Sequence, residues 1–496
     1  MVEYKEILIV IVVSFIFLFY WSWNRNSPIR IWPVVGMAPA VLHNIGRLHD
    51  FSAEILERGK GTLQFRGPWF SNLNFVLTSD SRNVQHILSK KFENFHRGPE
   101  FREIFEVLGD GIFNSDGDLW KTQQKALHSL IKNTKFELAV QRILTQKLER
   151  GLIPILESCS VLDMQDVFRH LTFDITCLLV FGFDPNCLSI EFPNVSCEKA
   201  YDVMVEAALH RYIVPTGFWK LQRLLQVGEE NRLRRAWETF DKFLYEQILL
   251  KHEKLSTKIA EKEEEFDLLT AFMLGEYGEK SNRFLRDTAY SLFAAGRDTV
   301  AAALVWFLWL VATHPSVEEK ILEEIKVNNM QASEDCKWKT YSVKEMSKLV
   351  YLHGAISEAL RLYPPVPFEH RASFQPDILP SGHPVGRNTK IILSLYSMGR
   401  SKEIWGEDCL EFKPQRWISE QGSIVHIPSY KFMPFLTGPR TCFGKDTAFY
   451  QIKTVAVAVI QNYHVKVLEN HPVTPSPSVV LKMKHGLLVR VSKRHR

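Results

Sequence analysis

The 496-residue chain lacks the cysteine spacing of a disulfide framework or of a structural zinc site. Its seven cysteines are odd in number and scattered, and no two of them are separated by two residues. Both kinds of site depend on closely and regularly spaced cysteines. We therefore expect most of these residues to be plain thiols in a reducing, cytosolic setting.

The chain also lacks clustered basic stripes, low-complexity segments, internal repeats and a recognisable nucleotide-binding or flavin-binding segment. Hydrophobic residues make up 46% and charged residues 24%, which is ordinary for a large globular protein. A net charge of +5 fits an anionic membrane surface or an acidic protein partner. Nucleic-acid binding usually shows a concentrated basic patch, so no nucleic-acid partner is expected.

Charge is missing from residues 7–23, which read ILIVIVVSFIFLFYWSW. This run is about as short as a bilayer span can be. A cleaved secretory signal is the alternative, but the run lacks a small-residue cleavage site and ends in aromatic residues suited to the membrane interface. Arg25 and Arg30 follow it, so the positive-inside rule places the rest of the chain in the cytosol. The expected parts are a membrane anchor over 1–24, a proline-containing joint over 25–49 and one large domain over 50–496.

The rest of the chain is expected to be mainly α with a small β region. From about residue 50 to 461, apolar residues recur at three- and four-residue spacing, which predicts helices. A second apolar stretch, 300–312, is too short for a membrane span and follows a charged pair, so it predicts a buried core helix over about 286–314, ended by Pro315. Short strand-like runs occur at 63–65, 75–78, 390–395 and 486–491.

The segment FLTGPRTCFG, from Phe435 to Gly444, carries the most specific pattern in the chain, F-x-x-G-x-R-x-C-x-G. A thiolate that binds haem iron must be deprotonated, and backbone N–H groups of a glycine-bearing turn can hold its charge. Gly438 and Gly444 permit close approach to a porphyrin, Phe435 would shield the sulfur, and Arg440 is placed to pair with a haem propionate. The pattern predicts Cys442 as the iron ligand of haem b; a structural cysteine in an arginine-bearing loop is the alternative.

This segment resembles the haem-binding signature of the cytochrome P450 family, and residues 295–299, AGRDT, resemble that family's oxygen-activation motif. The resemblance implies the cytochrome P450 fold and a haem-thiolate monooxygenase domain over 50–496. It also implies that Thr299 and Asp298 deliver the protons that cleavage of dioxygen requires. Gly296 lies in the middle of a helix, where glycine costs about 1 kcal/mol relative to alanine. Its presence indicates either close approach of a ligand or packing against a neighbouring helix.

Glu358 and Arg361 resemble the family's E-x-x-R pair, whose spacing puts both side chains on one helical face. Glu229 and Arg232 match the same pattern, so only context separates the two. A Pro-Pro helix stop follows the first pair, and Arg416 lies at the family's usual distance before the cysteine. By resemblance, Arg416 completes a buried network with Glu358 and Arg361 that is structural rather than catalytic.

The most serious departure from the family pattern follows Trp120. The family places an arginine four residues after Trp120, where this chain has Gln124. This difference puts propionate binding at that position in doubt. By position, Trp120, His128 and Arg371 are further candidates for contact with the cofactor, beside Arg440.

Three longer segments, 108–121, 362–385 and 430–453, look like the plant clan of alkane and fatty-acid hydroxylases, particularly the mid-chain alkane hydroxylases. Relatives in that branch oxidise long alkyl chains, and an offshoot couples phenols in alkaloid synthesis. The resemblance implies a single-pass protein of the endoplasmic reticulum membrane that takes electrons from NADPH through NADPH–cytochrome P450 reductase. It would hydroxylate a hydrophobic small molecule, expected to be a long-chain alkane or fatty-acid derivative.

Three alternatives remain at this point: an oxidase of an aromatic or alkaloid-like plant metabolite, a haem-thiolate isomerase, and a non-catalytic haem carrier. The intact AGRDT segment argues against the isomerase, which needs no proton delivery. Lys413 and Lys445 are candidates for a reductase-docking face. His210 and Arg211 could be polar partners of a ring substrate, or a solvated surface pair. Candidate substrate contacts, for which core packing is the alternative, are Phe113, Phe293, Ala294, Ala295, Val366 and Phe368.

Overall fold

The computed structural model describes residues 27–494 except 70, 194, 258–265, 276–280, 329 and 331–340, together with scattered positions from 7 to 25. The expected membrane segment, 7–23, lies partly outside the described residues, so the anchor stays a prediction. Among the described residues, only the helix Asn282–Thr313 (α14) has the length and apolar composition to cross a membrane. Because 72% of its most apolar window is buried inside the protein, α14 is a core helix.

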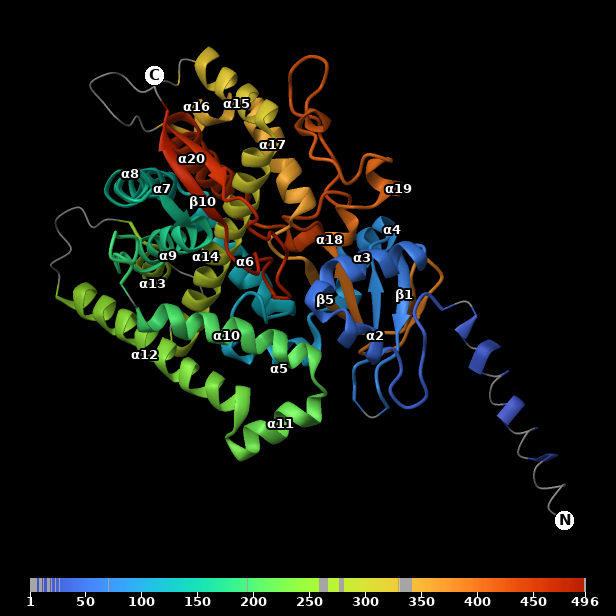
Figure 1. Cartoon of the computed structure of the whole chain (residues 1–496). Helices are drawn as coiled ribbons and strands as arrows, with labels where there is room; N and C mark the ends of the chain where they lie inside the picture. Colours follow the sequence, from blue (N-terminus) through green and yellow to red (C-terminus); the bar gives the residue numbers. More distant parts are fainter. Residues whose placement is uncertain are drawn as a thin grey trace.

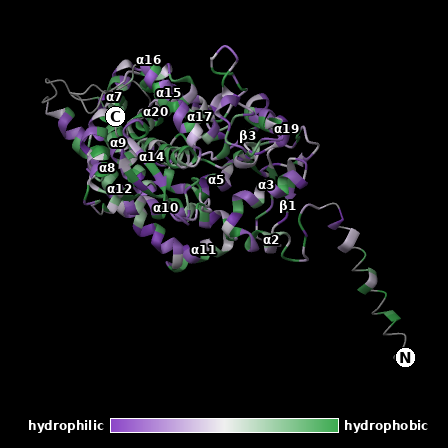
Figure 2. Ribbon diagram, turned by 45° about the horizontal axis from the view of Figure 1, so that its top comes forward, coloured by the Kyte–Doolittle hydropathy of each residue, from purple (hydrophilic) through white to green (hydrophobic). Residues whose placement is uncertain are grey.

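The fold is mainly helical, as the sequence predicts (Figure 1). Figure 2 shows hydrophobic residues gathered in the interior around α14, whereas the outer helices are largely hydrophilic. The helices, besides α14, are α2 (Ala38–His43), α3 (Leu48–Arg58), α4 (Ser81–Gln85), α5 (Gly98–Ile104), α6 (Gly117–Ile131), α7 (Thr134–Lys147), α8 (Ile153–Ser158), α9 (Met164–Phe181), α10 (Ser196–Ile213), α11 (Thr216–Leu225), α12 (Gly228–Ser256), α13 (Leu268–Leu274), α15 (Pro315–Val327), α16 (Val343–Ser347), α17 (Val350–Leu362), α18 (Leu395–Met398), α19 (Lys402–Trp405) and α20 (Lys445–Asn462).

Helix α14 crosses the molecule and packs against α9, α12, α17 and α20. The Ser281 side chain caps its start by accepting a hydrogen bond from the backbone N–H of Phe284. Its end at Thr313 follows from Pro315, which disfavours helical geometry in the residue before it and begins α15. The predicted core helix is therefore confirmed, with a start four residues earlier than expected.

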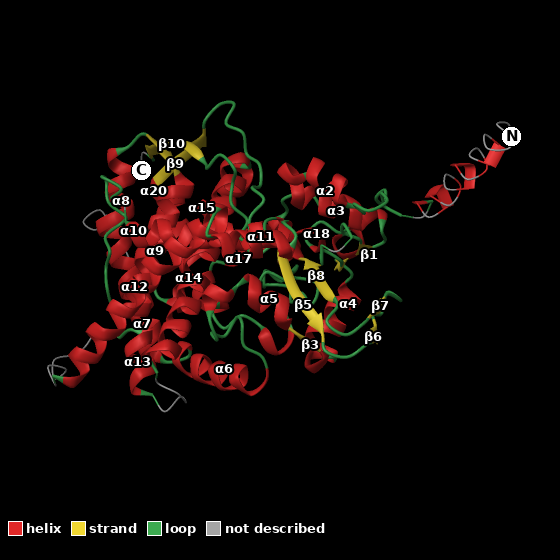
Figure 3. Ribbon diagram, turned by 90° about the horizontal axis from the view of Figure 1, so that it is seen from below, coloured by secondary structure: helices red, strands yellow, loops and turns green. Residues whose placement is uncertain are grey.

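A five-stranded sheet lies at one side of the helical body (Figure 3). Its strand order is β1 (Thr62–Phe65), β2 (Phe75–Thr78), β8 (Lys390–Ser394), β5 (Phe368–Ser373) and β3 (Phe95–His96). The pair β2–β8 is parallel and the other pairs are antiparallel. A second sheet has the order β4 (Val161–Asp163), β10 (Leu488–Lys493), β9 (Tyr463–Val467), and β6 (Asp377–Ile378) pairs with β7 (Pro384–Val385).

All four strand-like runs are strands, with bounds within two residues of the predicted ones. The prediction missed β5, an interior strand of its sheet that pairs with both β8 and β3. Its sequence, FEHRAS, is half charged or imidazole-bearing and has no strand pattern. Glu369, His370 and Arg371 in this strand are nevertheless all buried, and two of them bear on the site described next.

Candidate active site

The loop that carries Cys442 folds back on itself just before α20. The backbone N–H of Cys442 donates a hydrogen bond of 2.9 Å to the carbonyl oxygen of Phe435. Gly438 has a φ of +73°, and a Cβ there would lie 1.9 Å from the carbonyl oxygen of Leu88. Only glycine satisfies both conditions, so this residue fixes the path of the loop.

The sulfur of Cys442 faces a cavity. The residue has a large accessible area although protein atoms surround it, because its exposed surface points into that cavity. Burial raises the pKa of the Cys442 thiol, and a hydrogen bond from the backbone of Gly444 acts in the opposite direction. A thiolate in this place therefore needs a further positive partner, and a metal ion bound to the sulfur supplies one.

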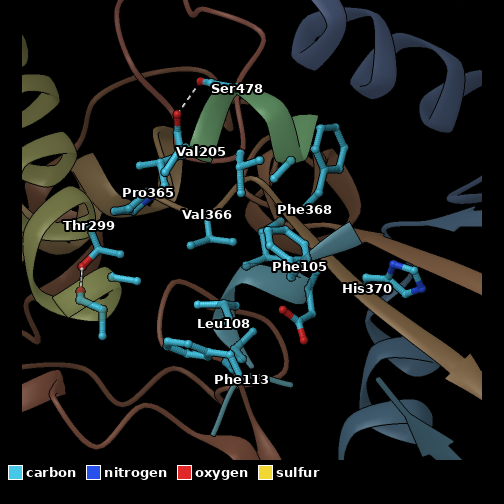
Figure 4. A pocket seen from close by; sticks show the side chains of 18 of the residues that line it. Phe105, Leu108, Phe113, Val205, Thr299, Pro365, Val366, Phe368, His370 and Ser478 are labelled. Atoms are coloured by element: carbon cyan, nitrogen blue, oxygen red, sulfur yellow. Dashed lines mark hydrogen bonds between the residues drawn. The ribbon is translucent and has the colours of Figure 1, made fainter. Parts of the chain in front are cut away.

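The cavity above Cys442 has a volume of about 890 Å³, and its wall is mostly apolar (Figure 4). Helix α14 contributes Ala295, Gly296, Thr299 and Ala303 to it. Among the predicted substrate contacts, Phe113, Ala294, Ala295, Val366 and Phe368 do line the cavity.

The prediction for Phe293 was wrong. Its side chain is fully buried and packs edge-on against Phe173 and Tyr201, with ring centroids at 5.4 and 5.1 Å. The core-packing alternative holds for this residue, because on α14 it faces α9 and α10 rather than the cavity.

Three arginines with buried side chains, Arg97, Arg371 and Arg440, lie near one another. Arg97 and Arg440 line the cavity, whereas Arg371 is fully buried and does not. Arg440 donates hydrogen bonds to the Ser115 carbonyl at 2.8 Å and to the Asp116 carboxylate at 2.6 Å. Burial, followed by the charges of Arg97 and Arg371, lowers the pKa of Arg440 to about 9 and indicates uncompensated positive charge.

The positive charge in this cluster exceeds the negative charge around it. Arg97 and Arg371 share the single carboxylate of Glu369. Within the described part of the chain, the Nε of Arg97 and both the Nε and one Nη of Arg371 have no hydrogen-bond partner. Buried guanidinium donors without partners are costly. Two carboxylate groups would satisfy them, and haem b carries two propionates, so these residues fit the cofactor.

Sequence reasoning named Arg371 and Arg440 but missed Arg97. The residue directly follows the two-residue strand β3, and a single arginine beside a short strand has no distinctive pattern. Only the pairing of β3 with β5, which brings Arg97 to Glu369, shows that it belongs to this cluster.

The three residues of α6 that the sequence analysis singled out have different places in the structure. Trp120 is buried, lines the cavity and lies under the Arg440 guanidinium at 4.6 Å. Gln124 donates a hydrogen bond of 2.9 Å to the carbonyl oxygen of Pro439. His128 is exposed, and its ring contacts Phe443 edge-on at 5.8 Å rather than lining the cavity. Gln124, which stands where the family pattern has arginine, therefore joins α6 to the cysteine loop.

Gly296 packs closely against α9. A Cβ at this position would lie 2.9 Å from the hydroxyl oxygen of Thr176, which is closer than side-chain contacts allow. The helix-packing alternative thus accounts for the glycine. Helix α14 is continuous here, and the Thr299 hydroxyl donates a 2.7 Å hydrogen bond to the Ala295 carbonyl.

Asp298 does not line the cavity and is buried against Arg297 at 3.2 Å. Among the described residues its second carboxylate oxygen has no partner. Arg297 is fully buried and forms two further ion pairs with residues of α10, at 2.8 Å to Glu198 and 2.7 Å to Asp202. The motif on α14 is therefore connected by charge to α10.

Glu358, Arg361 and Arg416 come together in one network. Arg361 binds Glu358 at 2.7 and 2.8 Å, and Arg416 approaches the same carboxylate at 3.3 Å. Trp417 donates a 2.8 Å hydrogen bond to Glu358. Arg361 also holds the Cys409 carbonyl at 2.6 Å, so the network fixes the irregular segment that leads to Cys442.

Neither His210 nor Arg211 lines the cavity. Arg211 is buried, binds Glu230 at 2.7 Å and lies over the Trp219 ring at 4.8 Å. The polar-partner hypothesis is therefore wrong for both, and Arg211 is not a solvated surface residue either. The next residue, Tyr212, is the one that lines the cavity.

Three features together define a haem-thiolate protein. They are the fold, the cysteine loop that faces an apolar cavity, and the cationic donors without partners beside that loop. Residues 28–490 match the Cytochrome P450 family model, and the chain belongs to that family. The family binds the iron of haem b through a cysteine thiolate, and the chain is accordingly a monooxygenase.

Several plant proteins are similar to this chain over most of its length. Alkane hydroxylase MAH1 of Arabidopsis thaliana is 41% identical, with 94% of this chain and 93% of the relative covered. Cytochrome P450 86B1 of the same plant is 40% identical, with 94% and 85% covered. Noroxomaritidine synthase of Narcissus aff. pseudonarcissus MK-2014 is 38% identical, with 99% and 97% covered. The predicted family and its plant alkane-hydroxylase relatives are confirmed.

Proposed function

We propose that this chain is a membrane-bound monooxygenase that hydroxylates a long-chain alkane or fatty-acid derivative, using O2 and electrons that NADPH supplies through NADPH–cytochrome P450 reductase. The observation that carries the proposal is the mostly apolar cavity of about 890 Å³. It runs from Cys442 to α2 and α3, where Leu42, which also lines it, is 62% exposed. An alkyl chain gains about 0.8 kcal/mol per buried methylene in such a space.

Cys442 is assigned as the iron ligand, and Arg97, Arg371, Arg440 and Trp120 as the residues that hold the propionate side of the cofactor. When bound, haem b supplies activation of dioxygen and insertion of one oxygen atom into a C–H bond. The polypeptide excludes water with its apolar wall, positions the chain to be oxidised, and moves protons.

The Thr299 hydroxyl is assigned to pass a proton at its Oγ1. Its hydrogen is donated to the Ala295 carbonyl, so the lone pairs of Oγ1 remain available to a water on the cavity side. Asp298 is assigned to supply that proton, which requires its carboxylate to turn from Arg297 toward Thr299.

A reductase would dock on the face beside the cysteine loop. Lys445 is exposed at the start of α20, directly after that loop, and can attract an acidic partner. Lys413 is less suited to this role than expected from the sequence, because Asp408 and Glu411 neutralise it at 2.9 and 3.0 Å.

Membrane attachment is supported by apolar side chains near the N-terminal part of the domain. Val34, Leu42 and Trp69 are all more than half exposed, and Leu42 also lies at the cavity wall. A lipid-facing surface at this place would let a hydrophobic substrate enter from the bilayer. We assign the protein to the endoplasmic reticulum membrane, with a single span and a cytosolic domain.

A second candidate function is the oxidation of a phenolic plant metabolite. Its support is the 38% identity, over 99% of this chain, to a noroxomaritidine synthase. A compact ring substrate would depend on fixed polar partners, because buried hydroxyl groups without partners cost about 1–3 kcal/mol each.

The test is expression with a plant reductase, followed by product analysis and by titration of the haem spin shift. We expect NADPH-dependent hydroxylation of long alkyl chains, and an affinity that rises with chain length. A flat response to chain length with a clear shift from one phenol would favour the second candidate. A haem carrier would use no NADPH, and an isomerase would act on a peroxide without reductase.

A further inference from the structure

The polar side chains on the cavity wall mostly satisfy their own hydrogen bonds. Thr299 donates to the Ala295 carbonyl at 2.7 Å, Ser291 to the Asp287 carbonyl at 2.9 Å and Ser52 to the His49 carbonyl at 2.6 Å. These hydroxyl hydrogens are used by the backbone of their own helices. They leave the cavity with little capacity to orient a polar substrate.

Tyr212 and His370 are different. Both line the cavity, and the Tyr212 hydroxyl lies 2.9 Å from the Nδ1 of His370. Tyr212 comes from the last turn of α10, and His370 from the middle of β5. In Figure 4, Thr299 and His370 lie on opposite sides of the pocket, with Val366 and Phe368 between them. The pair is therefore remote from the helix turn beside Cys442.

One hydrogen-bonding position of this pair is unused whichever tautomer His370 adopts. If the phenol donates to Nδ1, its oxygen can still accept; if Nδ1–H donates to the phenol, the phenol hydrogen is still available. No other hydrogen bond of the Tyr212 hydroxyl occurs within the described residues, and the Nε2 of His370 is buried there without a partner. A buried polar pair that is incompletely bonded costs stability, which points to a ligand.

The surroundings favour a neutral ligand. Burial, and then Lys390, Arg97 and Arg371, lower the pKa of His370 well below its ordinary value, so the imidazole is neutral. Lys390 is already paired with Glu100. Side chains alternate along β5, so Arg371 and its free donors point away from the face that carries His370. Arg97 also lines the cavity and acts on Tyr212 by its charge, but Glu369 pairs with it at 2.6 Å and its free Nε is assigned above to a propionate. Among the described residues, no further cation is left for a carboxylate beside Tyr212.

We propose that Tyr212, positioned by His370, binds a hydroxyl group of the substrate at the end of the cavity opposite Thr299. A hydroxyl both donates and accepts, so it fits the pair in either tautomer. This inference rests on the proposed function and narrows it: the preferred substrate is a long-chain alcohol, oxidised at a carbon remote from the hydroxyl. A plain alkane would bind through its chain alone, and a free fatty acid would bury an unpaired charge.

The test measures binding of dodecane, dodecan-1-ol and dodecanoic acid to the haem-loaded enzyme by the absorption shift and by calorimetry. Tyr212→Phe should lower the affinity for dodecan-1-ol about five- to tenfold, which corresponds to the loss of one hydrogen bond, and should change the affinity for dodecane by no more than about twofold. His370→Phe should also reduce the preference for dodecan-1-ol over dodecane. If His370 were needed only for the fold, the variant would lower the affinity for both ligands alike. Tyr290→Phe is the matched control, because Tyr290 also lines the cavity but directs its hydroxyl to Met204.

If Tyr212→Phe weakens the binding of alcohol and alkane equally, or weakens neither, the inference is wrong. The proposed function still holds in that case, provided that the wild-type enzyme binds and oxidises the alkane. A loss confined to dodecanoic acid would show a carboxylate site and refute the hydroxyl class. If none of the long-chain ligands binds and a phenol does, the proposed function and this inference fail together. Each variant is first checked for the wild-type ferrous carbonyl spectrum.

Discussion

The side-chain amide of Gln124 donates a hydrogen bond of 2.9 Å to the carbonyl oxygen of Pro439 and so ties α6 to the loop that carries Cys442. At this position the family pattern has an arginine. The cationic function that arginine would provide is available here from Arg97, Arg371 and Arg440, which lie close enough to act on one another by their charges. Gln124 is therefore a support of the cysteine loop.

Replacing Gln124 with leucine should loosen that loop and speed haem loss. One neutral hydrogen bond contributes about 1 kcal/mol, so the rate of haem transfer to an acceptor protein should rise about fivefold. Lys125→Ala, at the exposed neighbouring position, is the control and should leave the rate unchanged. Equal rates for Gln124→Leu and wild type would mean that the loop does not depend on this bond.

Arg97→Leu should weaken haem retention more strongly. It removes a charge-assisted contact to a propionate, worth about 1.5–3 kcal/mol, from a site where Glu369 remains paired with Arg371. The same transfer assay measures it. Arg102→Leu is a matched control, because Arg102 is about half exposed and its ion pair with Asp116 is long, at 3.7 Å. Similar haem loss from both variants would refute the assignment of Arg97.

Cys442→Ser should preserve the fold but abolish the strongly red-shifted Soret band of the ferrous carbonyl complex, which requires a thiolate ligand. Absorption spectroscopy with carbon monoxide checks this, and circular dichroism checks the fold. Cys409→Ser, at a buried cysteine outside the cavity, should retain the band. Retention of the band in Cys442→Ser would exclude Cys442 as the ligand.

Thr299→Ala should still oxidise NADPH but release more hydrogen peroxide and less product, because proton delivery is impaired while substrate binding is not. Thr313→Ala is the matched control: it lies on the same helix and makes the same kind of bond, 2.9 Å to the Trp309 carbonyl, but does not line the cavity. Peroxide and product are measured per NADPH. Full coupling in Thr299→Ala would contradict the role.

His353 should make the protein sensitive to acid. Burial, and then Lys453 and Lys445, lower its pKa to about 3, and its ring stacks on Phe449 at 4.2 Å. In the unfolded chain the imidazole of His353 is protonated below about pH 6.5, whereas in the folded protein it stays neutral down to about pH 3. The free energy of unfolding therefore decreases as the pH falls below about 6.5, by about 2 kcal/mol near pH 5. His353→Phe keeps the ring contact and should unfold at a lower pH than wild type.

Helical circular dichroism during acid titration follows this transition. The control is His485→Gln, which removes an exposed histidine and should leave the midpoint unchanged. An unaltered midpoint in His353→Phe would show that other groups govern acid unfolding.

Features encoded by neighbouring residues were predictable from the sequence. The spacing of Glu358 and Arg361 already places them on one helical face, and Gly438 and Cys442 belong to one continuous loop. The end of α14 follows from Pro315. In each case the determining interactions lie within a few residues of each other.

Features that depend on contacts between distant segments were not predictable. Strand β5 exists because β8 and β3 pair with it on either side, against the polarity of its own sequence. Arg97 joins the arginine cluster only through that pairing. Arg211 and Tyr212 are adjacent, yet the first binds Glu230 of α12 and the second lines the cavity, a difference set by how α10 packs.

The ion pairs of Arg297 restrict the movement of α10. Its ion pairs with Glu198 and Asp202 pin the first half of α10 to α14, and breaking a buried pair costs about 3–5 kcal/mol. The opposite end of α10 is held by other elements: Arg211 is paired with Glu230 of α12 at 2.7 Å, and Tyr212 is hydrogen-bonded to His370 of β5 at 2.9 Å. Both ends of α10 are therefore fixed by buried polar contacts. The part of the cavity wall that α10 forms can move apart from its neighbours only if such a contact breaks, so this wall is a firm boundary for the substrate.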